Sequence, residues 1–237
     1  MAKGKLYLIP VPLGENSRAE DILTPQVLTI VRSLKSFIVE NEKSARHFLK
    51  LAGTPFPLQE IALFPIGKHV EQSDTSRYLD AVKNGADMGL LSEAGCPGVA
   101  DPGAEIVWMA HDAGIIVVPL IGPSSLLLSL MASGMNGQQF RFHGYLPIDK
   151  GERSRYLKNL ERETRQQSVT HLFIETPFRN RQLLDDLLKT LDNSTRLCIA
   201  CSVTQPDEYI RTRTIGDWKR GTLPELHKRP AVFLIGK

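Results

Sequence analysis

The chain has 237 residues, of which 42% are hydrophobic and 23% are charged, and its formal net charge is +3. This length and composition suffice for one large core or two modest ones, which excludes a disordered protein. No apolar run approaches the roughly 18 residues of a membrane span, and the opening MAKGKLYLIP lacks the pattern of a secretory signal. We therefore expect a globular, cytoplasmic protein with no membrane partner.

The first half of the chain alternates between short apolar runs and helical patterns. The runs, each bounded by turn residues, are residues 5–9, 36–39, 60–64, 88–91 and 115–119. Thr24 and Pro25 form a helix-start signal that is followed by apolar residues at helical spacing. Further helices are expected at 42–52, 74–84 and 103–113. This alternation predicts an N-terminal α/β domain, residues 1–122, with a mainly parallel sheet.

Residues 123–237 predict a second α/β domain with a more mixed or antiparallel sheet. Strands are expected in 139–147, TRLCIACSV, EYIRTRTIG and PAVFLIGK, and helices at 124–133, 152–163 and 179–191. Residues 138–237 carry 18 basic and 12 acidic side chains, whereas residues 1–137 carry 11 and 14. The positive half either faces an anionic substrate or is simply a solvated surface.

The cysteines do not indicate a disulfide framework or a metal site. Cys96, Cys198 and Cys201 are odd in number and too few for a disulfide scaffold, in keeping with a reducing compartment. Cys198 and Cys201 lie in an apolar strand pattern, where residues three apart point to opposite faces, so we expect both in the core. The six histidines show no ligand spacing, and no metal is predicted.

Three loops follow strands of the predicted parallel sheet, where ligands of such sheets bind. They are PVPLGEN, SEAGCPGVADPG and LIGPSS. None matches a dinucleotide fingerprint or a P-loop, which disfavours a pyrophosphate ligand. Their small residues allow close backbone approach, while Glu93 and Asp101 favour a cation or ribose hydroxyls. A nucleoside that bears a sulfonium would fit.

Five motifs in order resemble one known family. They are LYLIPVPLGEN, SEAGCPGVADPG, PLIGPSSLLLSLMASG, FHGYLP with the basic KGERSR after it, and IETPFR. The chain resembles the tetrapyrrole methylase superfamily of S-adenosyl-L-methionine-dependent methyltransferases, and within it the branch of bacterial small-subunit ribosomal RNA 2′-O-ribose methyltransferases. The resemblance implies S-adenosyl-L-methionine as cofactor, held in a cleft between the two domains. It also implies ribosomal RNA or the small ribosomal subunit as partner, and a homodimer.

The resemblance further implies which positions hold the methyl donor. They are Pro10, Pro12, Leu13, Gly14, Ser92, Glu93, Ala94, Gly95, Cys96, Ser124, Ser125, Glu175, Thr176 and Pro177. Plainer roles are open to several of them, since a glycine permits a turn and a serine caps a helix. Methyl transfer to a hydroxyl needs alignment and removal of a proton. The candidate bases are Glu40, His69 and Glu93, although the two glutamates could instead bond loop amides.

The chain also departs from that branch. The segment VENEKSAR, residues 39–46, replaces A-E-D-T-R-H-T-R, and GKHVE, residues 67–71, keeps His69 and Glu71 of H-E-H-N-E. The branch usually continues into a helical extension, whereas this sequence stops at Lys237. These differences leave two alternatives open: methylation of a small molecule such as a tetrapyrrole, and a binding module that has lost donor binding.

A basic segment of the second half is the expected RNA contact. Its side chains are Arg153, Arg155, Lys158, Arg162 and Arg165, on or beside one predicted helix. Such residues position an RNA through its phosphates, and those contacts weaken steeply with salt.

Overall fold

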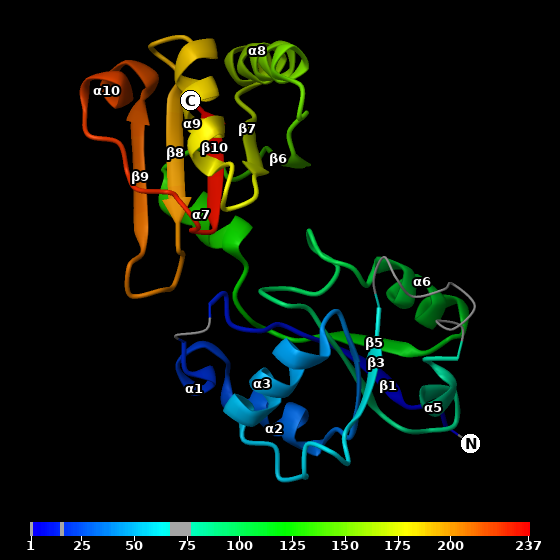
Figure 1. Ribbon diagram of the computed structural model, residues 1–237. Coiled ribbons are helices and arrows are strands. Elements are labelled where there is room, and N and C mark those ends of the chain that lie inside the picture. Colours follow the sequence, from blue (N-terminus) through cyan, green and yellow to red (C-terminus); the bar gives the residue numbers. More distant parts are fainter. Residues whose placement is uncertain (1, 15–16, 67–76) are drawn as a thin grey trace. The chain divides into compact units, whose positions relative to one another are not determined.

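The computed structural model describes residues 2–14, 17–66 and 77–237. The chain divides into two compact units, Met1–Ser124 and Ser125–Lys237. Each unit is an α/β structure with its own five-stranded sheet (Figure 1), which confirms the predicted fold class. His69 and Glu71 lie outside the described residues.

The sheet of the first unit is entirely parallel, in the order β3-β2-β4-β1-β5. Its strands are β1 (Lys5–Ile9), β2 (Ser36–Val39), β3 (Ala62–Pro65), β4 (Met88–Leu91) and β5 (Ile116–Pro119). Three of them match the apolar runs of the sequence. β3 starts later than expected because a turn precedes it, in which Glu60 N donates to Pro57 O at 2.9 Å.

Helices cover both faces of this sheet. One face carries α1 (Ala19–Ile22), α2 (Pro25–Ser33) and α3 (Glu42–Ala52), and the other carries α5 (Asp80–Lys83) and α6 (Ala104–Asp112). Phe37 packs in the first of these layers and Leu90 in the second, and both are fully buried. Thr24 caps α2 as expected, accepting from Val27 N at 3.4 Å. The helix expected at 74–84 is described only as α5.

The second unit has a mixed sheet in the order β6-β7-β10-β8-β9. Its strands are β6 (Phe140–Tyr145), β7 (Thr170–Ile174), β8 (Arg196–Cys201), β9 (Tyr209–Thr214) and β10 (Ala231–Gly236). β6 pairs parallel with β7, and all other pairs are antiparallel. β10 therefore occupies the centre of the sheet, between two strands that precede it in the chain.

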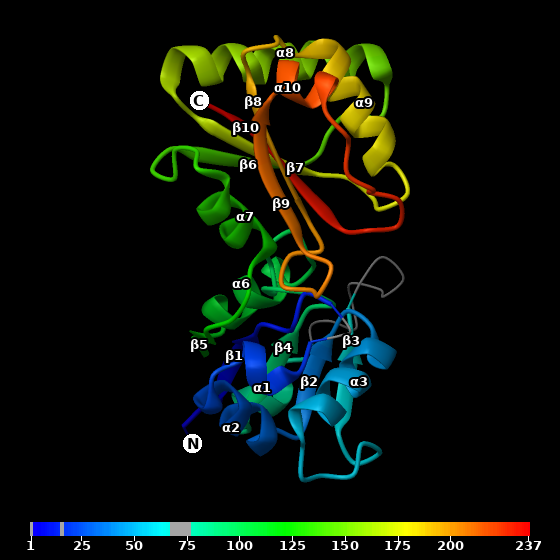
Figure 2. The ribbon, with the colours of Figure 1, turned by 90° about the vertical axis from the view of Figure 1, so that its left-hand side faces the viewer.

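The second sheet is also covered on both faces, as Figure 2 shows for α7 and α9. Its helices are α7 (Ser125–Ser133), α8 (Lys150–Gln167), α9 (Asn180–Thr190) and α10 (Ile215–Arg220). Cys198 packs with α7 and Cys201 with the helices of the other face, which confirms the expected opposite directions. Over the described ranges, no helix has the length and apolar character needed to cross a bilayer.

Candidate functional site

The loops after β1, β4 and β5 are tied together at one edge of the first sheet. Because the strands are parallel, their carboxyl ends share that edge. Val11 and Gly95 exchange two backbone hydrogen bonds, of 2.9 and 3.1 Å. The Cys96 thiol donates to Pro123 O at 3.3 Å. The three loops that the sequence singled out are therefore brought together.

Gly95 is constrained by this arrangement. Its φ is +74°, a left-handed conformation, and an added Cβ would lie 3.2 Å from Leu13 Cδ2. Only glycine adopts such a conformation without strain. Gly95 thus has a demonstrable role in the turn, and its predicted contact with the donor stays a prediction.

A cavity of about 650 Å³ opens beside these loops. It is lined by residues 11–14 of the first loop, by Glu93, and by one face of α3 with its cap: Asn41, Lys43, Ser44, His47, Phe48 and Leu51. This volume lies within the range of cavities that hold small-molecule ligands. Pro12, Leu13, Gly14 and Glu93 of the predicted donor site line it.

The α3 face was not predicted from the sequence to be part of the site. Ser44, His47 and Leu51 recur at helical spacing directly after the carboxyl end of β2, which is the signal that could have revealed it. Asn41, which replaces an aspartate of the related branch, caps α3 by accepting from Lys43 N at 2.8 Å. The rewritten segment therefore forms one wall of the cavity.

Three carboxyl groups at this edge influence one another. Burial and then the charge of Glu93 raise the pKa of Glu40, although a hydrogen bond from the Glu93 backbone lowers it. Burial, and then Glu40 and Glu93, raise the pKa of Asp101 to about 6. Ser44 Oγ donates to Glu93 Oε1 at 3.3 Å. In the part of the chain that the structure describes, Glu40 Oε2 is buried without a hydrogen-bond partner.

These groups form an acidic cluster, defined here as Glu40, Glu93 and Asp101. It brings together two of the predicted bases and adds Asp101, which the sequence suggested for cation or ribose binding but not as a base. Glu93 lines the cavity, and the pKa values of Glu40 and Asp101 are raised partly by its charge. Such carboxyl groups are suited to attracting a cation or accepting a proton. Among residues 2–14, 17–66 and 77–237, no group of three or more potential ligands is arranged to hold a metal ion.

The predicted residues of the second unit are placed by their own local bonds. Glu175 is buried and its Oε1 accepts from Thr176 N at 2.7 Å and from Arg179 Nη2 at 2.7 Å. Pro177 O accepts from Lys228 N at 3.1 Å. Ser125 is the first residue of α7, and Ser124 precedes it. Whether this unit completes the donor cleft stays a prediction.

Comparison with known proteins identifies the family. The sequence profile of the tetrapyrrole (corrin/porphyrin) methylases matches residues 5–219. The chain belongs to this family. It is therefore a methyltransferase, and S-adenosyl-L-methionine is its methyl donor.

Relatives in several bacteria are named ribosomal RNA small subunit methyltransferase I. The protein of Escherichia coli O157:H7 is 29% identical over 216 residues, which cover 91% of this chain and 71% of that protein. That of Halalkalibacterium halodurans is 31% identical, with 94% and 70% covered. That of Mycobacterium bovis is 30% identical over 237 residues, with 100% and 76% covered.

Solved structures share the fold. The methyltransferase CobJ superposes with a TM-score of 0.64 at 20% identity, covering 99% of this chain and 94% of that one. A uroporphyrin-III C-methyltransferase from Thermus thermophilus, crystallised with S-adenosylhomocysteine, gives 0.59 at 18% identity, with 99% and 98% covered. At these identities the similarity shows a shared fold and nothing about the substrate.

The residues of the first unit fit the donor. The cavity is large enough for a nucleoside, small residues of the loops leave backbone groups accessible, and the carboxylate of Glu93 on its wall suits a positively charged ligand. When bound, the donor supplies an activated methyl group on a sulfonium. The chain's own task is to align the acceptor with that methyl group.

Proposed function

We propose that this protein methylates a ribose 2′-hydroxyl of small-subunit ribosomal RNA. The observation that carries the proposal is the similarity, over 91% to 100% of the chain, to relatives named for that RNA. The ribose hydroxyl as acceptor follows from the resemblance of the loops to the 2′-O-methyltransferase branch. The protein would then act where small ribosomal subunits are present, in the cytoplasm.

The acidic cluster supplies the proton acceptor in this proposal. A ribose hydroxyl must lose its proton as the methyl group arrives, and a carboxylate whose pKa is raised is a better base than an ordinary one. The described candidates are Glu40 and Asp101, whose pKa values are raised, and Glu93, which lines the cavity. The positions proposed for the donor are the loops after β1, β4 and β5, together with residues 175–177 of the second unit.

We also propose a homodimer, as in the resemblance. Exposed apolar side chains of the second unit support it: Leu127 and Met131 on α7, and Phe140 and Tyr145 on the edge strand β6. Large apolar side chains that are exposed on one unit can mark an interface. Light scattering at micromolar concentration should give twice 26.4 kDa. A mass of one chain would reject the dimer.

The runner-up is methylation of a small molecule such as a tetrapyrrole. Two observations favour it: the altered residues of 39–46 form a wall of the cavity, and the solved structures of similar fold include a uroporphyrin methyltransferase. A binding module without donor affinity is the third possibility. Calorimetric titration with S-adenosylhomocysteine separates it from both enzymes, because a module would release no heat at high micromolar ligand.

The deciding experiment uses small ribosomal subunits from a host that lacks this gene, incubated with the protein and methyl-labelled donor. We expect label in RNA at one alkali-resistant dinucleotide, which marks a 2′-O-methyl group. Subunits from the parent host, already methylated, are the matched control and should accept little. Label that enters a tetrapyrrole but never the RNA would move the assignment to the runner-up.

A further inference from the structure

A second concave site lies between α8 and α9, on the outer layer of the second unit. Its volume is about 260 Å³. Lys150, Ser154 and Lys158 line it from α8, and their four-residue spacing puts them on one stripe of that helix. Asp186, Lys189 and Thr190 line it from α9. The volume is below the range of most small-molecule sites, so it suits a single small group.

The charge in this pocket is strongly positive. In the described ranges, none of its three lysines forms an ion pair with a carboxylate. The one carboxylate of the lining, Asp186, is bound by Arg153, whose Nη2 and Nε lie 2.5 and 3.0 Å from Asp186 Oδ2. Arg153 therefore offsets the charge of Asp186. Three ammonium groups remain uncompensated around one small cavity.

A buried ion pair between Arg153 and Asp186 holds the two helices that form the walls of the pocket. The Arg153 and Asp186 side chains are only 6% and 10% exposed, so this pair is a buried tie between α8 and α9. Arg153 Nη1 also donates to Pro147 O at 2.9 Å and Ile148 O at 2.8 Å, which anchors the start of α8. Because the two helices are already fixed, binding a ligand between them costs less conformational entropy.

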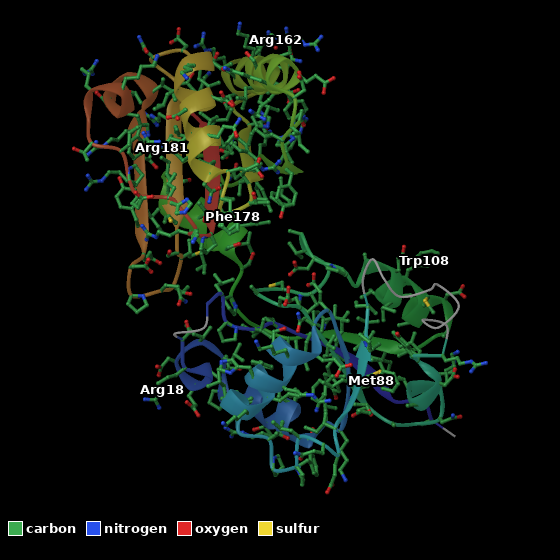
Figure 3. All side chains as sticks on the ribbon, in the orientation of Figure 1. Arg18, Met88, Trp108, Arg162, Phe178 and Arg181 are labelled. Atoms are coloured by element: carbon green, nitrogen blue, oxygen red, sulfur yellow. The ribbon has the colours of Figure 1, made fainter. Side chains whose placement is uncertain are left out.

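We propose that this lysine pocket, defined by Lys150, Lys158 and Lys189, binds a phosphate group of the RNA backbone. The hydroxyls of Ser154 and Thr190 provide further donors. The phosphate part rests on the pocket alone, whereas the RNA part rests on the proposed function. Arg155 and Arg162 lie on the same helix, and Figure 3 shows Arg162 directed away from the sheet, so positive charge continues along α8 as a backbone of successive phosphates requires.

A backbone contact predicts a particular kinetic pattern. Phosphate contacts position an RNA without reading its sequence, so they change affinity but not the nucleotide that is methylated. For Lys158→Gln/Lys189→Gln we expect the KM for small subunits to rise about tenfold or more, since charge-assisted contacts are strong. The kcat, the KM for S-adenosyl-L-methionine and the methylated position should not change.

The salt dependence makes the test specific. Log affinity falls linearly with log salt, and each lost phosphate contact should reduce the magnitude of that slope by about 0.7–0.9. The matched control is Lys3→Gln/Lys219→Gln, which removes two exposed lysines whose Nζ atoms bond the oxygens of Ala113 and Asn193 instead. It should retain the wild-type slope. Equal slopes for both double variants would overturn the RNA contact.

Inorganic phosphate tests the pocket without any RNA. In ³¹P NMR we expect line broadening with the wild type and with the control variant, and none with Lys158→Gln/Lys189→Gln. If the variant loses the broadening but the wild type methylates no RNA, the phosphate site stands and the proposed function is rejected. If the wild type methylates RNA but the lysine variant changes neither the broadening nor the salt slope, this inference is rejected. The proposed function would then still stand.

Discussion

Individual side chains of the acidic cluster determine how the reaction should respond to pH. Asp101 has a pKa raised to about 6, first by burial and then by Glu40 and Glu93. If the cluster accepts the proton of the ribose, it acts only when ionised. The rate should therefore follow the ionisation of this group rather than that of an ordinary carboxylate near pH 4.

We predict that kcat/KM for RNA rises with pH around a midpoint near 6. Asp101→Asn should remove this midpoint, and Glu40→Gln should move it to lower pH because one of the charges that raise the Asp101 pKa is gone. Glu60→Gln, at an exposed position of the same unit, is the control and should keep the wild-type profile. A midpoint unchanged in Asp101→Asn would exclude this residue as the group that titrates.

The same carboxyl group affects stability with the opposite trend to most carboxylates. Its folded pKa exceeds the unfolded value of about 3.8, so its favourable contribution is complete below pH 3.8 and is lost as pH rises through 6. Asp101→Asn should therefore stabilise the protein at pH 8 by about 1 kcal/mol or less, allowing for solvent screening. Thermal unfolding should show a gain of at most about 2–4 °C at pH 8 and none at pH 4.

Gly95 illustrates which details of a single residue could not be predicted from the sequence. The loop composition predicted that small residues gather at one sheet edge, and they do. It did not reveal that Gly95 sits at a positive φ against Leu13, because backbone angles depend on the pairing with Val11. Gly95→Val would strain the turn whether or not the donor binds there. To test the predicted donor position we therefore choose Ser125→Trp, which should abolish donor binding if Ser125 contacts the donor.

Among whole elements, α8 shows both the success and the failure of prediction from pattern. Its existence was predicted, but the structure extends it to Lys150–Gln167. Arg153 was expected to face RNA because it lies in a basic run, and this was wrong: it is buried against Asp186. Arg153 shares the spacing of Leu157 and Leu160, so the helical period already placed it on the inner face. Helices as short as α1 and α10 offer too few residues for a period to appear.

The tie between α8 and α9 gives a prediction about stability. Asp186→Ala should cost about 3–5 kcal/mol because it leaves the Arg153 guanidinium buried without its counter-charge. Arg153→Met/Asp186→Leu should recover most of that loss, since apolar side chains can replace a buried pair. Urea unfolding measures both. A double variant no more stable than Asp186→Ala would show that the pair contributes specific bonds rather than compensation of charge.

At the scale of the whole molecule, the two units should respond differently to acid. In the second unit His143 bonds Tyr156 Oη at 2.8 Å and His171 Nδ1 at 2.9 Å. Burial lowers the pKa of His143, and burial together with His143 lowers the pKa of His171 to about 4. Both histidines bind protons more readily when unfolded, so the stability of this unit falls as pH drops from 6.5 towards 4. In the first unit the raised pKa of Asp101 has the reverse effect, because its contribution to stability grows as the pH falls.

We therefore predict that acidification from pH 8 to pH 5 separates the unfolding of the two units. The chain has two tryptophans, the exposed Trp108 in the first unit and the buried Trp218 in the second. In Trp108→Phe, Trp218 fluorescence reports the second unit alone, and its midpoint should fall by at least about 4 °C. In Trp218→Phe, Trp108 should show a smaller fall or none. Equal shifts for both reporters would contradict the prediction.

The central position of β10 affects how the protein is made. β10 pairs with both β7 and β8, so neither strand has its full set of neighbours until residue 236 has left the ribosome. The first unit, whose strands all lie before residue 120, can fold while the rest is still being synthesised. Until translation passes β10, the nascent second unit presents two open strand edges and depends on protection from aggregation.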